Sequence, residues 1–393
     1  MESRLAKWQH SMIRNNMERY RDSLANYYIK NKPVVEIDGY RAFSLLSPPL
    51  GSAAALRRVR SIMKNITHED TQIMDSGAAV WGSRTPHFIT MAVTYTCQCD
   101  CEHCSASSYK ERVERNQDGL SAEELKDAIR QTIDLGTTAV VFTGGEPLLY
   151  QPIYELIRSV EKSKSIATMF TNGEYLTEET VSRLKEAGLF GVFVSLDAPE
   201  AAVHDSKRKR SGLFEKAVKG IELCREKGIL TGISTYITRE KIENGELDAM
   251  MDLARELRVL EVFLFDVIAV GKLREHHDCM LGSNDVSDVA RFREKYNLLP
   301  EYPRIIHQTM FTSIAYPCAA EGCPAGVSQI HLRANGDVTP CDFTPLSFGN
   351  IREKPLKEIW ESLTKHEIYA KLSPRCRLSD PDLWDRLTQG KPD

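Results

Sequence analysis

The stretch Thr96–Ser105, TCQCDCEHCS, determines the fold and the chemistry expected of this chain. Cys97, Cys101 and Cys104 stand in it as C-x3-C-x2-C, a spacing that fits three thiolates on one tight loop. Such thiolates can hold three corners of a cubane iron–sulfur cluster, which leaves the fourth iron open to a small chelating molecule. Zinc sites also use closely spaced cysteines, so the loop alone leaves a zinc site open. Cys99 lies between the ligands, and we expect its side chain to face away.

Length, charge and cysteine content limit the class of protein. The 393 residues are enough for a large core with one or two smaller modules. The 51 Lys and Arg residues nearly balance the 55 Asp and Glu residues, which does not indicate a nucleic-acid partner. No apolar run is long enough to span a membrane, and residues 1–21 lack the apolar core of a secretory signal. Ten cysteines in such a chain favour metal or catalytic thiols in a reducing cytoplasm.

Two helices and a hairpin are predicted before residue 87. Helical spacing covers residues 5–30, and a hairpin over Val34–Ser44 turns at Asp38-Gly39. A second helix over Ala53–Ile66 carries several arginines, and residues 69–86 have the character of a linker. One interpretation is a helical cap packed on the main domain. The other is a basic surface that contacts a membrane or an anionic substrate.

From residue 87 onward, strands alternate with helices. The predicted strands are Phe88–Tyr95, Ala139–Thr143, Ala167–Thr171, Gly191–Leu196, Thr231–Thr238 and Glu261–Val267. The first helix begins at a Ser121–Glu124 capping box and ends at Gly136, and a later one ends at Gly188. Six strand–helix units predict an α/β fold with a parallel sheet and right-handed crossovers. Alternation alone does not separate an open sheet from a barrel.

Polar motifs follow the strands, at the edge where parallel α/β folds build their sites. Thr143-Gly144-Gly145-Glu146-Pro147 ends the second strand. Its glycines allow close approach of a backbone to a ligand, and Glu146 offers an acceptor for an ammonium group. Asn172 follows the third strand and Ser195 the fourth. His204-Asp205, Arg208, Gly212 and Phe214 come after that.

A second group of cysteines lies near the C-terminus: Cys318, Cys323, Cys341 and Cys376. Cys323 and Cys341 flank a predicted hairpin that turns at Asn335-Gly336. Four thiolates suffice for one [4Fe-4S] cluster, and zinc remains the alternative.

These motifs resemble the radical SAM superfamily, with CxxxCxxC for the cluster and GGEP for the methionine amino group of S-adenosylmethionine (SAM). The HDxxRxxxGxF spacing after the fourth strand and the C-terminal cysteines resemble the SPASM and twitch branch. The resemblance implies a partial (β/α)6 TIM-like barrel. It divides the chain into an N-terminal extension over 1–86, a radical SAM core over 87–275 and a small auxiliary-cluster module over 276–393.

The resemblance also assigns residues. Cys97, Cys101 and Cys104 would hold the SAM-binding [4Fe-4S] cluster, and the second cysteine group would hold an auxiliary [4Fe-4S] cluster. Ser195 and Arg208 would contact the ribose and the carboxylate of the cofactor. The implied cofactor-binding residues are His103, Gly144, Gly145, Glu146, Asn172, Ser195, Arg208 and Thr235.

The activity implied is reductive cleavage of SAM to a 5′-deoxyadenosyl radical, which abstracts hydrogen from a C–H bond of a small-molecule or peptide substrate. A flavodoxin or ferredoxin would supply the electron. We expect a net oxidation assisted by the auxiliary cluster. The alternatives are a redox-neutral epimerase with Cys279 as hydrogen donor and a peptide maturase. An iron–sulfur electron carrier or sensor would use the same cysteines, but it has no use for Glu146, Ser195 and Arg208 on successive strand ends.

Overall fold

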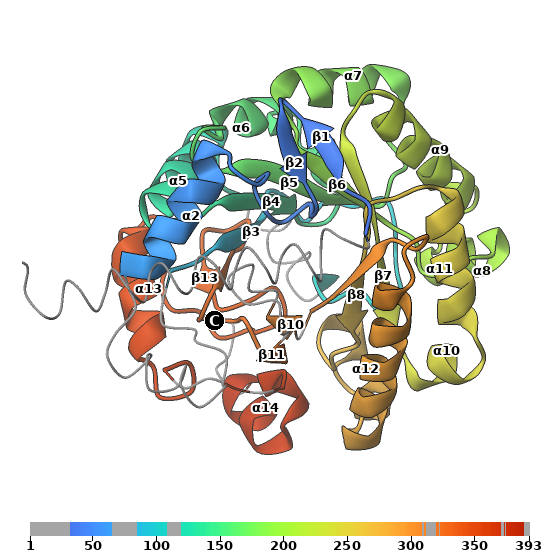
Figure 1. The fold of residues 1–393 in the computed structure, drawn as a ribbon. Helices are drawn as coiled ribbons and strands as arrows, with labels where there is room; N and C mark the ends of the chain where they lie inside the picture. The colour runs from blue at the N-terminus through green and yellow to red at the C-terminus, as the bar shows by residue number, and fades with distance from the viewer. Residues whose placement is uncertain are drawn as a thin grey trace, which may run out of the picture.

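The computed structural model describes residues 32–64, 85–107, 119–308, 310–311, 320–321, 323–370, 373 and 375–388 (Figure 1). The helix predicted over residues 5–30, most of the predicted linker and Cys318 lie outside these ranges.

One large sheet organises the fold, and its strands run in the order β13-β12-β3-β4-β5-β6-β7-β8-β9. Its six central strands are β3 (Phe88–Ala92), β4 (Ala139–Thr143), β5 (Ile166–Thr171), β6 (Gly191–Ser195), β7 (Leu230–Ile237) and β8 (Glu261–Asp266). Each pairs in parallel with the next along the chain, so the predicted strand–helix units and partial barrel are confirmed. The carboxyl ends of these strands therefore lie at one end of the barrel.

Helices cover the outer face of these strands (Figure 1). They are α5 (Ala122–Asp134), α6 (Ile153–Ser159), α7 (Glu178–Ala187), α8 (Ala201–Arg208), α9 (Leu213–Glu226), α10 (Arg239–Glu243) and α11 (Glu246–Glu256). The capping box is confirmed, because Ser121 Oγ accepts from Glu124 N and the Glu124 carboxylate accepts from Ser121 N. Gly188 ends α7 with a φ of 96°, a conformation that favours glycine.

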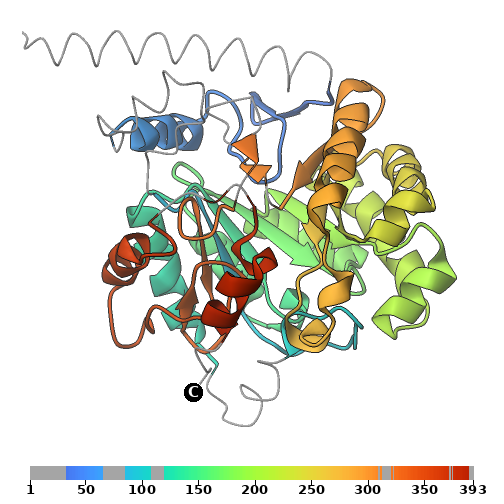
Figure 2. The ribbon, with the colours of Figure 1, turned by 90° about the horizontal axis from the view of Figure 1, so that it is seen from below.

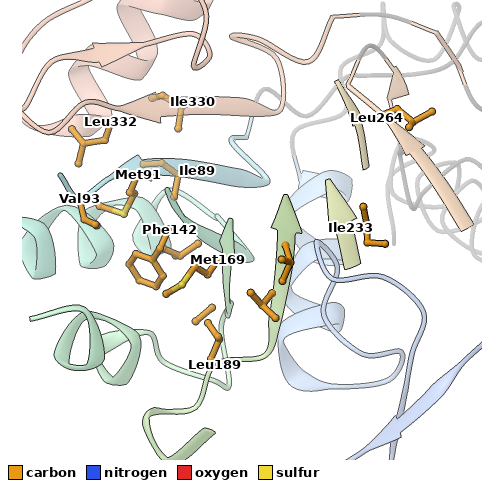
Figure 3. Packing of buried hydrophobic residues seen from close by; sticks show 14 of the residues in the cluster. Ile89, Met91, Val93, Phe142, Met169, Leu189, Ile233, Leu264, Ile330 and Leu332 are labelled. Atoms are coloured by element: carbon orange, nitrogen blue, oxygen red, sulfur yellow. The ribbon is translucent and has the colours of Figure 1, made fainter. Parts of the chain in front are cut away.

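The C-terminal module continues the barrel sheet. β9 (Arg304–His307) pairs in parallel with β8, while β12 (Gln329–Leu332) pairs in parallel with β3. β13 (Val338–Thr339) closes an antiparallel hairpin with β12. Ile330 and Leu332 pack with Ile89 and Met91 in the same buried cluster (Figure 3). The module therefore shares a sheet and a core with the barrel. The remaining elements are α12 (Ser283–Leu298), β10 (Met310–Phe311), β11 (Ala320–Glu321), α13 (Leu356–Lys365) and α14 (Pro381–Thr388).

The N-terminal extension closes the other end of the barrel, where the strands begin. It contains the predicted hairpin, β1 (Val35–Ile37) and β2 (Tyr40–Ala42), and the helix α2 (Ala53–Lys64) (Figure 2). Leu45 is fully buried, with its N–H bound to Glu261 Oε1 at 2.6 Å and its C=O bound to Thr168 Oγ1 at 2.7 Å. Both partners lie near the amino-terminal ends of their strands. The extension is thus a plug, which supports the cap interpretation.

Two arginines of α2, Arg57 and Arg58, contact the protein itself, while Arg60 is exposed. Arg57 Nη1 donates to the carbonyl oxygen of Thr137 at 2.9 Å, just before β4. Arg58 is buried beside Ser47. Membrane contact through this helix gains no support. No helix among the described residues has the length and apolar character needed to cross a bilayer.

Candidate active site

The cysteine loop after β3 lies directly on the Gly144-Gly145 turn after β4. Gly145 N donates to Thr94 O at 2.7 Å, and Glu146 N donates to Thr96 O at 2.9 Å. A Cβ atom on Gly144, whose φ is 139°, would stand 2.1 Å from Thr94 O. The sequence suggested that these glycines admit a ligand. In the structure they also admit the backbone of the cluster loop itself.

Two further segments fix the loop from outside. In α8, Arg208 O accepts a hydrogen bond from Asp100 N and Lys207 O accepts one from Glu102 N, each at 3.2 Å. After β8, Lys272 N donates to Cys104 O at 3.1 Å, and a Cβ on Gly271 would lie 2.2 Å from the same oxygen. Segments that follow three different strands, the helix α8 among them, therefore determine where the predicted cluster ligands stand.

Cys97, Cys101 and Cys104 form no disulfide and line a common cavity. The expectation that Cys99 faces away is wrong. Cys99 is 7% exposed and lines the same cavity. Its thiol is within hydrogen-bonding reach of the thiols of Cys101 and Cys97, and these contacts raise its pKa. The tight turn bends the loop enough to bring all four sulfurs to one side.

Glu146 joins the ends of β4 and β5. Its buried carboxylate accepts hydrogen bonds from Thr171 Oγ1 at 2.7 Å, Asn172 N at 2.9 Å and Leu148 N at 3.1 Å. Burial raises the pKa of Glu146 to about 7 despite these donors. Glu146 is not among the cavity-lining residues, whereas Gly144, Gly145 and Asn172 are. Its role toward the amino group of SAM stays a prediction.

Arg208 is held by an acid that the sequence reasoning left without a role. Arg208 Nη2 donates to Asp197 Oδ1 at 3.0 Å, and Arg208 Nε stands 2.7 Å from Asp197 Oδ2. Burial alone would raise the pKa of Asp197, but Arg208 holds it below its ordinary value. Asp197 follows Ser195 at the same strand end, and that spacing was the available signal. The Asp197 carboxylate therefore competes with the SAM carboxylate for the guanidinium group of Arg208.

His103, one of the implied cofactor-binding residues, stands just before Cys104 in the cluster loop. Its ring lies 4.4 Å from that of Tyr236, and Nε2 lies 3.5 Å from Asp197 Oδ2. Burial lowers the pKa of His103 to about 4, so the imidazole is neutral at neutral pH. Ser195 Oγ lies 3.0 Å from the hydroxyl of Ser234, and Ser195 and Thr235 both line the cavity. The predicted cofactor-binding residues other than Glu146 thus meet around one space.

Three cysteines of the second group converge. The thiols of Cys323 and Cys376 are hydrogen-bonded to each other, which lowers the pKa of Cys323 to about 5 and raises that of Cys376. Burial raises the pKa of Cys341 to about 12. Cys341 Sγ lies 3.3 Å from Thr344 Oγ1, and all three cysteines line one cavity. Three cysteine thiols gathered in this way are the donor set that an iron–sulfur cluster takes, so these residues fit one. The fourth predicted ligand, Cys318, lies outside the described residues.

The two cysteine groups lie at opposite ends of β3 and β12. Cys97 follows the carboxyl end of β3, whereas Cys323 and Cys341 flank the hairpin near the amino end of β12. A strand rises roughly 3.3 Å per residue, so strands of this length separate the groups by roughly 13–17 Å.

A cavity of about 360 Å³ connects these ends, and cysteines of both groups line it. Phe170, Phe263, Phe265 and Phe343 form an aromatic wall, with ring centroids of neighbouring pairs 4.5–6.3 Å apart. His307 Nε2 lies 2.7 Å from Asp266 Oδ1 at the β8–β9 edge of the same cavity. The sequence analysis predicted neither the aromatic wall nor the His307–Asp266 pair. Both join residues that are far apart in the sequence, and no local pattern indicates that β9 adjoins β8.

Cys279 lies elsewhere. It ends a short 3-10 helix (His277–Cys279), and Cys279 Sγ donates to His276 O at 2.7 Å. It is not among the described residues that line the cavity. The predicted role as hydrogen donor therefore gains no support from the geometry.

Comparison with known proteins agrees with this arrangement. The sequence profile of the radical SAM superfamily matches residues 91–254, and that of SPASM, an iron–sulfur cluster-binding domain, matches residues 323–378. This chain is a radical SAM protein with a C-terminal SPASM domain. Its cofactors are SAM, a SAM-binding [4Fe-4S] cluster and an auxiliary [4Fe-4S] cluster, as expected from the two cysteine groups.

Several curated relatives of this radical SAM protein have assigned names. An AdoMet-dependent heme synthase of Methanosarcina barkeri is 28% identical, over 74% of this chain and 85% of that protein. An Fe-coproporphyrin III synthase of the same organism is 27% identical, over 72% of this chain and 75% of that protein. The subtilosin biosynthesis protein AlbA of Bacillus subtilis is 26% identical, over 74% of this chain and 63% of AlbA.

Solved structures share the fold. Streptococcus suis SuiB bound to its precursor peptide SuiA has a TM-score of 0.57 at 17% identity, over 80% of this chain and 70% of SuiB. The protein anSMEcpe with bound AdoMet and peptide has a TM-score of 0.55 at 19% identity, over 75% of this chain and 91% of anSMEcpe. At these identities the likeness establishes the fold alone.

Proposed function

We propose that this radical SAM protein catalyses a net oxidation of a substrate bound in the cavity between the two cysteine groups. The observation that supports this most is that thiols of both groups line that one cavity. When bound, the SAM cluster supplies reductive cleavage of SAM, and the auxiliary cluster supplies a one-electron acceptor.

The chain's own contribution is placement. The Gly144-Gly145 turn and Lys272 hold the cluster loop, while Ser195, Arg208 and Asn172 line the cavity beside it. The aromatic wall, which includes the edge-to-face pair Phe170 and Phe263, excludes water and offers an apolar surface to the substrate. An electron leaving the substrate would need to cross only the length of β3 to reach the second cysteine group.

A tetrapyrrole is the substrate class that we propose first. Supporting this, four curated relatives are named for the synthesis of heme or of Fe-coproporphyrin III, at 26–28% identity. A flat conjugated ring also suits a wall of phenylalanines. The second candidate is a peptide, favoured by the likeness to AlbA and by the peptide-bound SuiB structure.

The test is an anaerobic incubation of the cluster-reconstituted protein with SAM, a reductant and iron coproporphyrin III. We expect 5′-deoxyadenosine and an oxidised, lighter porphyrin product. A deuterated substrate should pass deuterium into 5′-deoxyadenosine. A product whose mass is unchanged in H2O but one unit greater in D2O would instead indicate a redox-neutral outcome. If no porphyrin product forms and a cysteine-containing peptide is modified, the substrate is a peptide and the tetrapyrrole proposal is wrong.

A further inference from the structure

One carboxylate ties the barrel to the loop that carries the auxiliary cysteine Cys341. Asp342 Oδ2 accepts hydrogen bonds from Thr90 Oγ1 at 2.9 Å and from Gln329 Nε2 at 3.0 Å. Asp342 Oδ1 lies 3.2 Å from His331 Nδ1, and the same nitrogen lies 2.8 Å from Thr90 Oγ1. Thr90 belongs to β3, while Gln329 and His331 belong to β12.

The partners of Asp342 are rigid. Thr90 and His331 are 7% and 5% exposed, and they face each other across a paired position of the β3–β12 ladder. Asp342 itself lies on the wall of the cavity between the two cysteine groups. Because Cys341 is its chain neighbour, fixing the carboxylate on two strands also fixes the Cys341 thiol relative to β3.

We propose that Asp342 is a positioning residue for the auxiliary cluster and that its charge lowers the reduction potential of that cluster. The position follows from the contacts with Thr90, Gln329 and His331. The effect on the potential follows from Coulomb's law, because an electron added beside a fixed, partly buried anion is disfavoured.

Another charged group at this module acts in the opposite sense. Arg377 is buried, and its Nη1 lies 3.5 Å from the carbonyl oxygens of Cys323 and Ala325. A cation there favours the reduced cluster, so Asp342 and Arg377 shift the potential of the auxiliary cluster in opposite directions. This inference concerns the second cysteine group alone and does not depend on the identity of the substrate.

The decisive variant is Asp342→Asn, which keeps the shape and one acceptor oxygen but removes the charge. It is compared with wild type in the full chain with both clusters reconstituted, by redox titration monitored with EPR. A parallel titration uses the background in which Cys97, Cys101 and Cys104 are alanine, so that the auxiliary signal stands alone. We expect full iron content, an upward shift of the auxiliary midpoint potential and no shift of the SAM-cluster potential.

A second variant separates position from charge. Gln329→Leu removes one donor while the carboxylate stays charged. We expect faster release of auxiliary iron to a ferrous chelator without an upward shift of the potential. Asp337→Asn is the matched control in the same module, because Asp337 binds the side chains of Asn335 and Asn350 in the hairpin turn. Asp337→Asn should change neither the rate of iron release nor the midpoint potential of the auxiliary cluster.

The outcomes that overturn the proposal are specific. An unchanged or lower auxiliary potential in Asp342→Asn overturns the charge effect, and wild-type iron release in Gln329→Leu overturns the positioning. If Asp342→Asn holds no auxiliary cluster, Asp342→Glu decides, because it retains the charge. Auxiliary cluster present in Asp342→Glu supports the proposal, and its absence there as well overturns it.

Discussion

At the scale of single residues, Glu146 combines two demands that conflict. Its carboxylate binds three donors from the ends of β4 and β5, yet it is completely buried, and burial raises its pKa to about 7. Because this pKa lies above the ordinary value for Glu, ionisation of Glu146 destabilises the SAM-free protein as the pH rises through about 7. An ammonium group nearby would relieve that cost, since it favours the charged carboxylate.

We therefore predict that SAM binding weakens as the pH falls below about 7, approaching tenfold per pH unit, because the protonated acid must first lose its proton. Equilibrium dialysis of anaerobic protein between about pH 6 and about pH 8.5 would measure this. The Glu146→Gln variant should bind more weakly at high pH and show a flat profile. The same pH profile in both proteins would show that another group is responsible.

At the scale of elements, the cluster loop depends on the turn beneath it. Alanine at Gly144 would place its Cβ 2.1 Å from Thr94 O, so the loop must move. We predict that Gly144→Ala loses the SAM cluster and keeps the auxiliary one, which halves the iron per chain. Gly212→Ala is the control, because Gly212 also has a positive φ, of 72°, but no atom lies within 4 Å of its added Cβ. Iron analysis compares the two, and wild-type iron content in Gly144→Ala would contradict the loop-on-turn packing.

Sequence patterns anticipated the elements that carry local signals. The turn at Asp38-Gly39, the capping box at Ser121 and the glycine stop at Gly188 depend on neighbours a few residues away, so they are readable from the chain. The pairing of β12 with β3 joins residues about 240 positions apart, such as Thr90 and His331, and no local pattern specifies it. For that reason Asp342 and the β8–β9 edge of the site could not be predicted, although the cysteines and strand-end motifs could.

At the scale of the whole molecule, we predict two separable clusters, about eight irons per chain. Replacing Cys97, Cys101 and Cys104 by alanine should leave about four irons and abolish cleavage of SAM. Replacing Cys323, Cys341 and Cys376 by alanine should leave the irons of the SAM-binding cluster and preserve slow cleavage of SAM. Iron analysis and EPR measure both. Stoichiometric zinc in the wild type, or full iron in either variant, would refute the assignment.

The plug at the amino end of the barrel predicts a different effect. Leu45 is fully buried against Phe193 and the backbone of Gly191. Leu45→Ala should lower the free energy of unfolding by about 2–5 kcal/mol, because it leaves a cavity in the barrel. Urea denaturation of the cluster-free protein measures this, with the half-exposed Leu56→Ala expected to change the value by less than about 0.5 kcal/mol. An equal effect in both variants would argue against the plug.

The placement of β12 beside β3 also bears on how the chain is made. A ribosome delivers β3 long before β12, so β3 must wait with one edge unpaired while more than half of the chain emerges. Unpaired parallel edges attract other strands, and distant pairings form slowly. The nascent protein should therefore be most prone to aggregation just before residue 330 leaves the exit tunnel, and a chain cut before β12 should not yield a free-standing barrel.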